Sequence, residues 1–80
     1  MSIQNAINFI SDVDSDSDLR KSYYKYKTQA DLLESLASQQ KGFTADEFAN
    51  AVNMLLFKCD TYDQAGRVKE IQAWFKLFKA

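Results

Sequence analysis

The stretch Gly-Phe-Thr-Ala-Asp-Glu-Phe, residues 42–48, carries the strongest local structural signal in the chain. Thr44 and Glu47 have the T-x-x-E spacing of a capping box, in which each side chain accepts a hydrogen bond from the backbone N–H of the other residue. Phe43 precedes the cap and Phe48 occupies the fourth helical position, which is the spacing of a hydrophobic staple. The stretch therefore predicts that a helix begins at residue 45.

The residues before this stretch predict a helix that ends at the same corner. Thr28 is a potential N-cap with Asp31 three residues later, and the leucines at positions 32, 33 and 36 supply an apolar side. Gly42 is the natural stop, because glycine enters the left-handed conformation without steric cost. We expect helices over residues 29–40 and 45–59 that meet as a corner or hairpin. The second is apolar over most of its circumference, which is typical of a central helix.

Apolar residues at helical spacing predict three more helices. One follows Ser2, has Phe9 at the edge of its apolar stripe, and ends in the Asp/Ser run at residues 14–17. After a loop at residues 60–63, an amphipathic C-terminal helix has Trp74 beside its stripe and Leu77 well off it. The predicted fold class is all-α, a small bundle of about five helices over residues 3–13, 17–26, 29–40, 45–59 and 65–79.

Length and composition fit a single helical domain over residues 1–80. Of the 80 residues 46% are hydrophobic, and the chain contains no proline and two glycines. Cys59 is the single cysteine, so no internal disulfide can form. Neither a signal peptide nor the roughly 18 apolar residues of a membrane span is visible. We expect a cytoplasmic protein without a transmembrane segment. No single-sign charge field predicts nucleic-acid binding.

The sequence predicts no enzyme, no cofactor and no metal site. It contains no histidine, the commonest general base and metal ligand. Cys59 has no histidine to activate it and lies on an apolar helical face, so we expect a small core residue. The acidic series at positions 12, 14, 16 and 18 lacks the sixth-position glycine and twelfth-position glutamate of a calcium loop. We interpret it as a helix-capping turn.

Four apolar side chains remain once the helical stripes are assigned: Tyr24, Phe57, Trp74 and Leu77. Exposed aromatic and large aliphatic residues with a polar rim are the usual anchors of a protein interface. We predict these four as partner-binding residues. The alternative for Trp74 is burial by a last helix that packs on both sides. The alternative for Tyr24 is a lone exposed aromatic of the kind common on protein surfaces.

Short motifs within residues 1–50 resemble the Nif-eleven-like family of small helical domains, which is named for nitrogen-fixation gene clusters. They are Met-Ser-Ile-Gln-Asn-Ala-Ile-Asn-Phe at residues 1–9, Asp-Ser-Asp-Leu-Arg-Lys at residues 16–21, the helix start at residues 28–37, and the corner at residues 42–48. The resemblance implies a helical domain that is recognised rather than catalytic. In leader-type members, enzymes that modify a C-terminal core peptide bind the helical part.

We therefore expect a stand-alone, non-catalytic adaptor or regulatory domain in the cytoplasm of a bacterium, bound by another protein through the last helix and the far side of the helix at residues 45–59. The alternative is the precursor of a ribosomally made, modified peptide, with a leader over about residues 1–66 that a maturation enzyme binds and a cationic amphipathic product at residues 67–80. The nearest match to a cleavage site is Ala65-Gly66. Self-association through the C-terminal helix is a third alternative.

Overall fold

The computed structural model describes residues 2–78 and confirms the all-α fold class. It contains α1 (Ile3–Ser15), α2 (Ser17–Ser22), a 3-10 turn η1 (Tyr23–Lys25), α3 (Gln29–Ser38), α4 (Ala45–Lys58) and α5 (Tyr62–Lys76). All five predicted helices are present, with differences at their ends. Within the described residues, no helix has the length and apolar character needed to cross a membrane.

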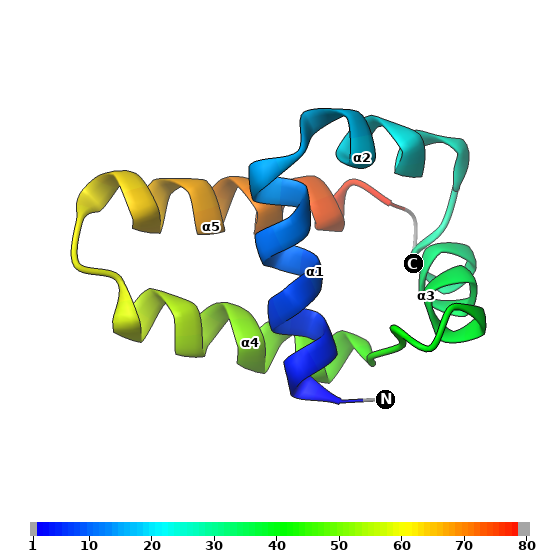
Figure 1. The fold of residues 1–80 in the computed structure, drawn as a ribbon, viewed down its shortest axis with the longest axis horizontal. Helices are drawn as coiled ribbons and strands as arrows, with labels where there is room; N and C mark the ends of the chain where they lie inside the picture. The colour runs from blue at the N-terminus through cyan, green and yellow to red at the C-terminus, as the bar shows by residue number, and fades with distance from the viewer. Residues whose placement is uncertain (1, 79–80) are drawn as a thin grey trace.

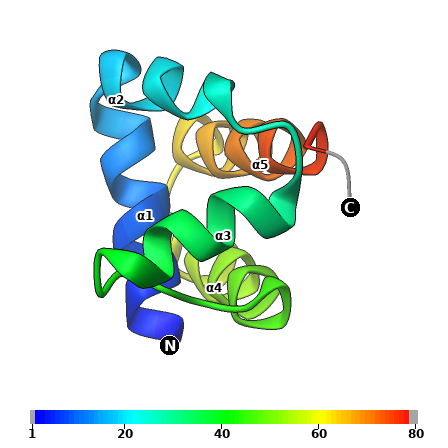
Figure 2. The same ribbon diagram turned by 90° about the vertical axis from the view of Figure 1, so that its right-hand side faces the viewer.

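Helices α4 and α5 run side by side in opposite directions and are joined by a short turn (Figure 1). Helix α1 crosses over both of them, and α3 lies across the end of the pair that is opposite the turn (Figures 1 and 2). The prediction made α4 the central helix, but the structure gives that place to α1, which packs against α2, α4 and α5.

The core is a cluster of aromatic rings centred on Phe9. Its ring centroid lies 5.2 to 6.3 Å from the centroids of rings on three other elements and on the corner, namely those of Tyr23, Phe43, Phe48, Trp74 and Phe75. Phe9 was expected at the edge of its stripe, yet its ring connects α1 to the aromatic residues of η1, the corner, α4 and α5. Phe48 and Phe75 stack with centroids 4.0 Å apart and so join α4 to α5.

The predicted capping box at the start of α4 is confirmed. Thr44 N–H donates to Glu47 Oε1 at 2.9 Å, and Glu47 N–H donates to Thr44 Oγ1 at 3.0 Å, so both bonds of the capping box form. The staple is also present, because the buried rings of Phe43 and Phe48 stack with centroids 6.1 Å apart. These contacts fix the direction in which α4 leaves the corner.

The prediction that a left-handed Gly42 ends α3 is wrong. Gln40 has the positive φ of 60°, whereas neither glycine does. Gln40 N–H donates to Ala37 O at 3.1 Å and Lys41 N–H donates to Leu36 O at 2.9 Å, which is the bonding pattern of a Schellman motif. The helix therefore ends at Ser38, before the predicted residue 40.

The predicted loop at residues 60–63 is also wrong in part. Thr61 is the N-cap of α5, because its Oγ1 accepts a hydrogen bond from Gln64 N–H at 3.2 Å, and the helix begins at Tyr62 rather than at residue 65. The helix ends at Lys76, and residue 79, its predicted end, lies outside the described residues. The predicted helix at 17–26 divides into α2 and η1, and Tyr26 is extended.

Candidate functional site

The structure divides the four predicted partner-binding residues into exposed and buried ones. Tyr24, Phe57 and Leu77 are 60%, 93% and 81% exposed. Trp74 is 6% exposed and lies in the core, which was the alternative for this residue. Its ring stacks on that of Phe9, with centroids 6.0 Å apart. Trp74 is therefore not a protruding anchor.

Three of these residues nevertheless line one surface hollow, of about 260 Å³, between η1 and the C-terminal end of α5. Aromatic and aliphatic side chains and one lysine form its lining: Tyr24, Tyr26, Lys27, Trp74, Leu77 and Phe78. We call it the Tyr24–Leu77 hollow. Tyr24 and Leu77 are its exposed apolar members, and the buried Trp74 and Phe78 form its base. The structure thus brings together residues that are about fifty positions apart in the chain.

Two hydrogen bonds hold the segment after α2 against its neighbours. Gln29 Nε2–H donates to Phe75 O at 3.3 Å, which ties the start of α3 to the end of α5. Tyr26 and Ser35 share a 2.6 Å hydrogen bond between their hydroxyl groups, which ties the extended residue after η1 to α3. Figure 2 shows this segment passing beside the end of α5. The hollow is therefore built by elements that are anchored to one another.

The chain around the hollow is basic. Residues 19–30 contain Arg20, Lys21, Lys25 and Lys27 and no acidic residue. The guanidinium of Arg20 lies 5.5 Å from the centroid of the Trp74 ring and pairs with a Glu70 oxygen at 3.3 Å. Neither Lys25 nor Lys27 forms an ion pair within residues 2–78. The lysine charges beside the hollow are therefore not neutralised by this part of the chain.

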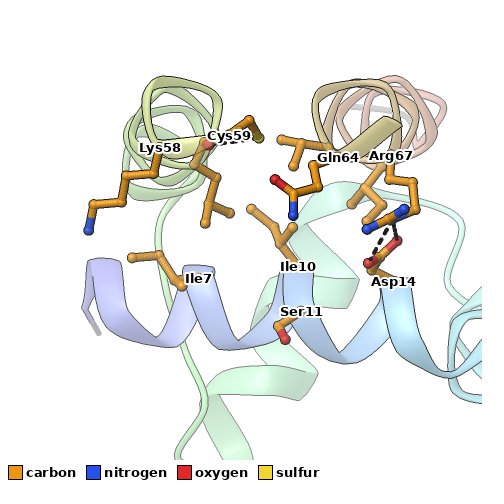
Figure 3. A pocket seen from close by; sticks show the side chains of 11 residues that line it. Ile7, Ile10, Ser11, Asp14, Lys58, Cys59, Gln64 and Arg67 are labelled. Atoms are coloured by element: carbon orange, nitrogen blue, oxygen red, sulfur yellow. Dashed lines mark hydrogen bonds and ion pairs between the residues drawn. The ribbon is translucent and has the colours of Figure 1, made fainter. Parts of the chain in front are cut away.

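A second groove, of about 320 Å³, lies between α1, α4 and α5 near the turn (Figure 3). Five aliphatic residues line it, namely Ile7, Ile10, Leu55, Val68 and Ile71, together with polar and charged ones. Arg67 and Asp14 form an ion pair across its mouth, with 3.3 Å between Arg67 Nε and an Asp14 oxygen. Cys59 lies at its edge and donates its Sγ–H to Leu55 O at 3.0 Å. Cys59 is half-buried rather than a full core residue.

Phe57 is not part of either hollow. It lies near the C-terminal end of α4, at the turn to α5, whereas Leu77 lies at the other end of α5 (Figure 1). A helix of 15 residues separates the two ends by about 20 Å. Tyr62, which is 97% exposed, lies at the same turn as Phe57. The sequence prediction missed Tyr62 because it was assigned to a loop.

Within residues 2–78, no group of three or more His, Cys, Asp or Glu side chains could hold a metal ion. Burial raises the pKa of the Tyr23 phenol, and the negative charge of Asp12 and the neighbouring Tyr26 add to the shift. Tyr23 is packed against Phe9, with ring centroids 5.5 Å apart, so we interpret this shift as a consequence of core packing.

No family model matches the chain, and neither a curated protein nor a solved structure matches it. The fold and the site define a small all-α domain with a mostly apolar hollow that Lys27 also lines.

Proposed function

We propose that this chain is a non-catalytic protein-recognition domain whose partner inserts a side chain into the Tyr24–Leu77 hollow. The observation that carries the proposal is that Tyr24 and Leu77, two exposed residues that no helical stripe accounts for, converge on one hollow. Large apolar side chains beside a buried aromatic base and a polar rim are the usual composition of an interface hot spot.

The energetics support a binding role for these two residues. Leu77 exposes most of its side chain, and burying a side chain of this kind contributes about 1.5–3 kcal/mol. The base of the hollow needs no rearrangement, because Trp74 is held between Phe9 and Phe78, whose centroids lie 6.0 and 5.3 Å from its own. A preformed site lowers the entropic cost of binding.

Membership of the Nif-eleven-like family is part of the proposal, and it rests on the motifs within residues 1–50. The corner at residues 42–48 folds as a capping box with a staple. A recognised helical domain is what the resemblance implies. A bacterial cytoplasmic setting belongs to the same proposal.

The precursor alternative gains no support from the fold. Gly66 lies inside α5, and cleavage after it would remove Ile71, Trp74 and Phe75 from the core. The remaining leader would lose Phe75, whose ring stacks on that of Phe48. Self-association through α5 would have to use Tyr62 or Leu77 at the two ends of that helix, because Ile71, Trp74 and Phe75 of its apolar stripe are buried.

Affinity capture from the native host tests the proposal. We expect the wild-type chain to retain a partner that the double variant Y24S/L77S does not retain, with the same helical circular dichroism for both chains. The control is F57S, which alters an equally exposed residue outside the hollow and should retain the partner. Retention by Y24S/L77S together with loss by F57S would move the interface to the α4–α5 turn and refute the proposal.

A further inference from the structure

We infer that the segment which occupies the Tyr24–Leu77 hollow is an acidic peptide segment with one large apolar side chain. This inference rests on the proposed function and specifies the chemistry of the partner. Three features of the described residues support it: the size of the hollow, the charges on its rim, and the burial of the apolar stripe of α5.

The hollow has room for one large side chain. A cavity of about 150 Å³ lined by apolar side chains binds benzene, and this hollow is larger, at about 260 Å³. Its base is formed by Trp74 and Phe78, with Leu77 and Tyr24 exposed beside them. A leucine or phenylalanine of a partner would bury its own surface and that of Leu77 in one step.

The charges favour an acidic partner. Lys27 lines the hollow, and Lys25 lies beside it with its Nζ 5.2 Å from the centroid of the Tyr26 ring. The nearest acidic side chains on α3, Asp31 and Glu34, line a neighbouring depression with both lysines but pair with neither within 4.0 Å. The lysines can therefore turn to carboxylates on a partner, and charges on the rim of an interface act chiefly on the rate and selectivity of association.

An anionic membrane surface would also attract lysines, but the shape of the site favours a peptide. A helix that lies on a membrane presents a wide apolar face to the lipid. In α5 that face is turned inward, because Ile71, Trp74 and Phe75 are buried in the core. Among the apolar residues that line the hollow within residues 2–78, Tyr24 and Leu77 are the exposed ones. One concave site with two exposed apolar residues suits a single inserted side chain.

Trp74 provides the signal for a direct test, because it is the only tryptophan and it lines the hollow. The full chain is titrated with a short synthetic peptide of Asp, Glu and Ser that has one central Leu. A second peptide has Lys in place of the acidic residues, and a third has Ser in place of the central Leu. The fourth probe is a phosphatidylglycerol vesicle. We expect saturable change in Trp74 fluorescence with the acidic Leu peptide alone, weakened by added salt.

Two lysine pairs separate local from general charge effects. In K25Q/K27Q the dissociation constant of the acidic Leu peptide should rise about three- to tenfold. In K41Q/K58Q, which alters exposed lysines that do not line the hollow, it should not change. Equal binding of the basic peptide, binding of the vesicle alone, or equal effects of the two lysine pairs would overturn the inference.

Affinity capture of the host partner tests the proposed function, and it is independent of the peptide titration that tests the acidic chemistry. If Y24S/L77S loses the captured partner while K25Q/K27Q keeps it and the acidic peptide does not bind, the recognition role stands and the acidic chemistry is refuted. If Y24S/L77S keeps the partner and the acidic peptide does not bind, both are refuted.

Discussion

Gly42 lies so close to Ala37 that a Cβ at position 42 would be 3.0 Å from the Ala37 Cα and 3.1 Å from its Cβ. The chain turns back on the end of α3 at this point. Gly42 O then accepts hydrogen bonds from Ser2 N–H at 3.3 Å and from Asn5 Nδ2–H at 2.9 Å, which tie the corner to the start of α1. Space, rather than a left-handed backbone, is the reason for glycine here.

The two glycines are therefore expected to respond in opposite directions to alanine. The G42A variant must shift the backbone of α3, which we expect to lower the free energy of unfolding by about 1–3 kcal/mol. Gly66 lies within α5 with no atom near its Cβ position, so G66A should raise the free energy of unfolding by about 0.5–1 kcal/mol. Urea denaturation of both variants measures the difference, and effects of the same sign would contradict it.

The aromatic cluster predicts a large effect at Phe9. The F9A variant removes the ring on which α1, α4 and α5 meet, at a cost of about 3–5 kcal/mol. A loss of that size is a large part of the stability of a domain of this length. F57A removes an equally large side chain that is 93% exposed, and we expect a change within about 0.5 kcal/mol. Thermal unfolding of F9A and F57A, monitored by circular dichroism, measures the difference. Equal melting temperatures for the two variants would refute the arrangement of the core.

The N-cap of α5 provides a test of the helix start that the sequence prediction missed. The T61A variant removes the oxygen that accepts from Gln64 N–H and should lower the free energy of unfolding by about 1 kcal/mol. The control T61S keeps a hydroxyl in the same place and should keep most of the stability. If urea denaturation shows the same stability for T61A and wild type, α5 does not begin at Tyr62.

Local signals in the sequence were sufficient to predict the helices, but not to predict how the helices contact one another. The T-x-x-E spacing identified the start of α4, because capping depends on residues three positions apart. The Thr61–Gln64 cap was missed because Asp60 to Asp63 has the composition of a turn. The apolar spacing of α1 could not predict the central position of Phe9, because that position depends on contacts with rings of α4, α5 and the corner.

The same limit applies to the candidate site. Tyr24 and Leu77 were identified as residues outside the stripes, but their meeting depends on how the end of α5 lies beside η1. Tyr26 was included in the predicted helix at residues 17–26, but this residue is extended, so helical spacing could not place its side chain at the hollow. Trp74 was ambiguous for a physical reason: it flanks the buried stripe, so the placement of α1 decides whether it is covered.

The raised pKa of Tyr23 predicts a loss of stability in alkaline solution. In the unfolded chain this phenol titrates near its ordinary pKa of 10.0, whereas burial first, and then Asp12 and Tyr26, keep it protonated to higher pH in the folded chain. The contribution of the Tyr23 phenol to the free energy of unfolding is therefore fully present below pH 10, and it is lost as the pH rises through the pKa of the folded chain. We expect the stability of wild type to fall more than that of Y23F between pH 8 and pH 11. Equal losses in denaturant titrations would contradict the shift.

The most direct test of the proposed interface is site-specific photo-crosslinking in living cells of the native host. A photoreactive amino acid is placed at position 77 in one chain and at position 57 in another. Both positions are exposed, but position 77 follows the C-terminal end of α5, whereas position 57 lies at the end of α4, beside the turn. The proposed recognition role predicts a discrete crosslinked partner from position 77 and none from position 57. Crosslinking from position 57 alone, or from neither position, would contradict the claim that the Tyr24–Leu77 hollow is the binding site.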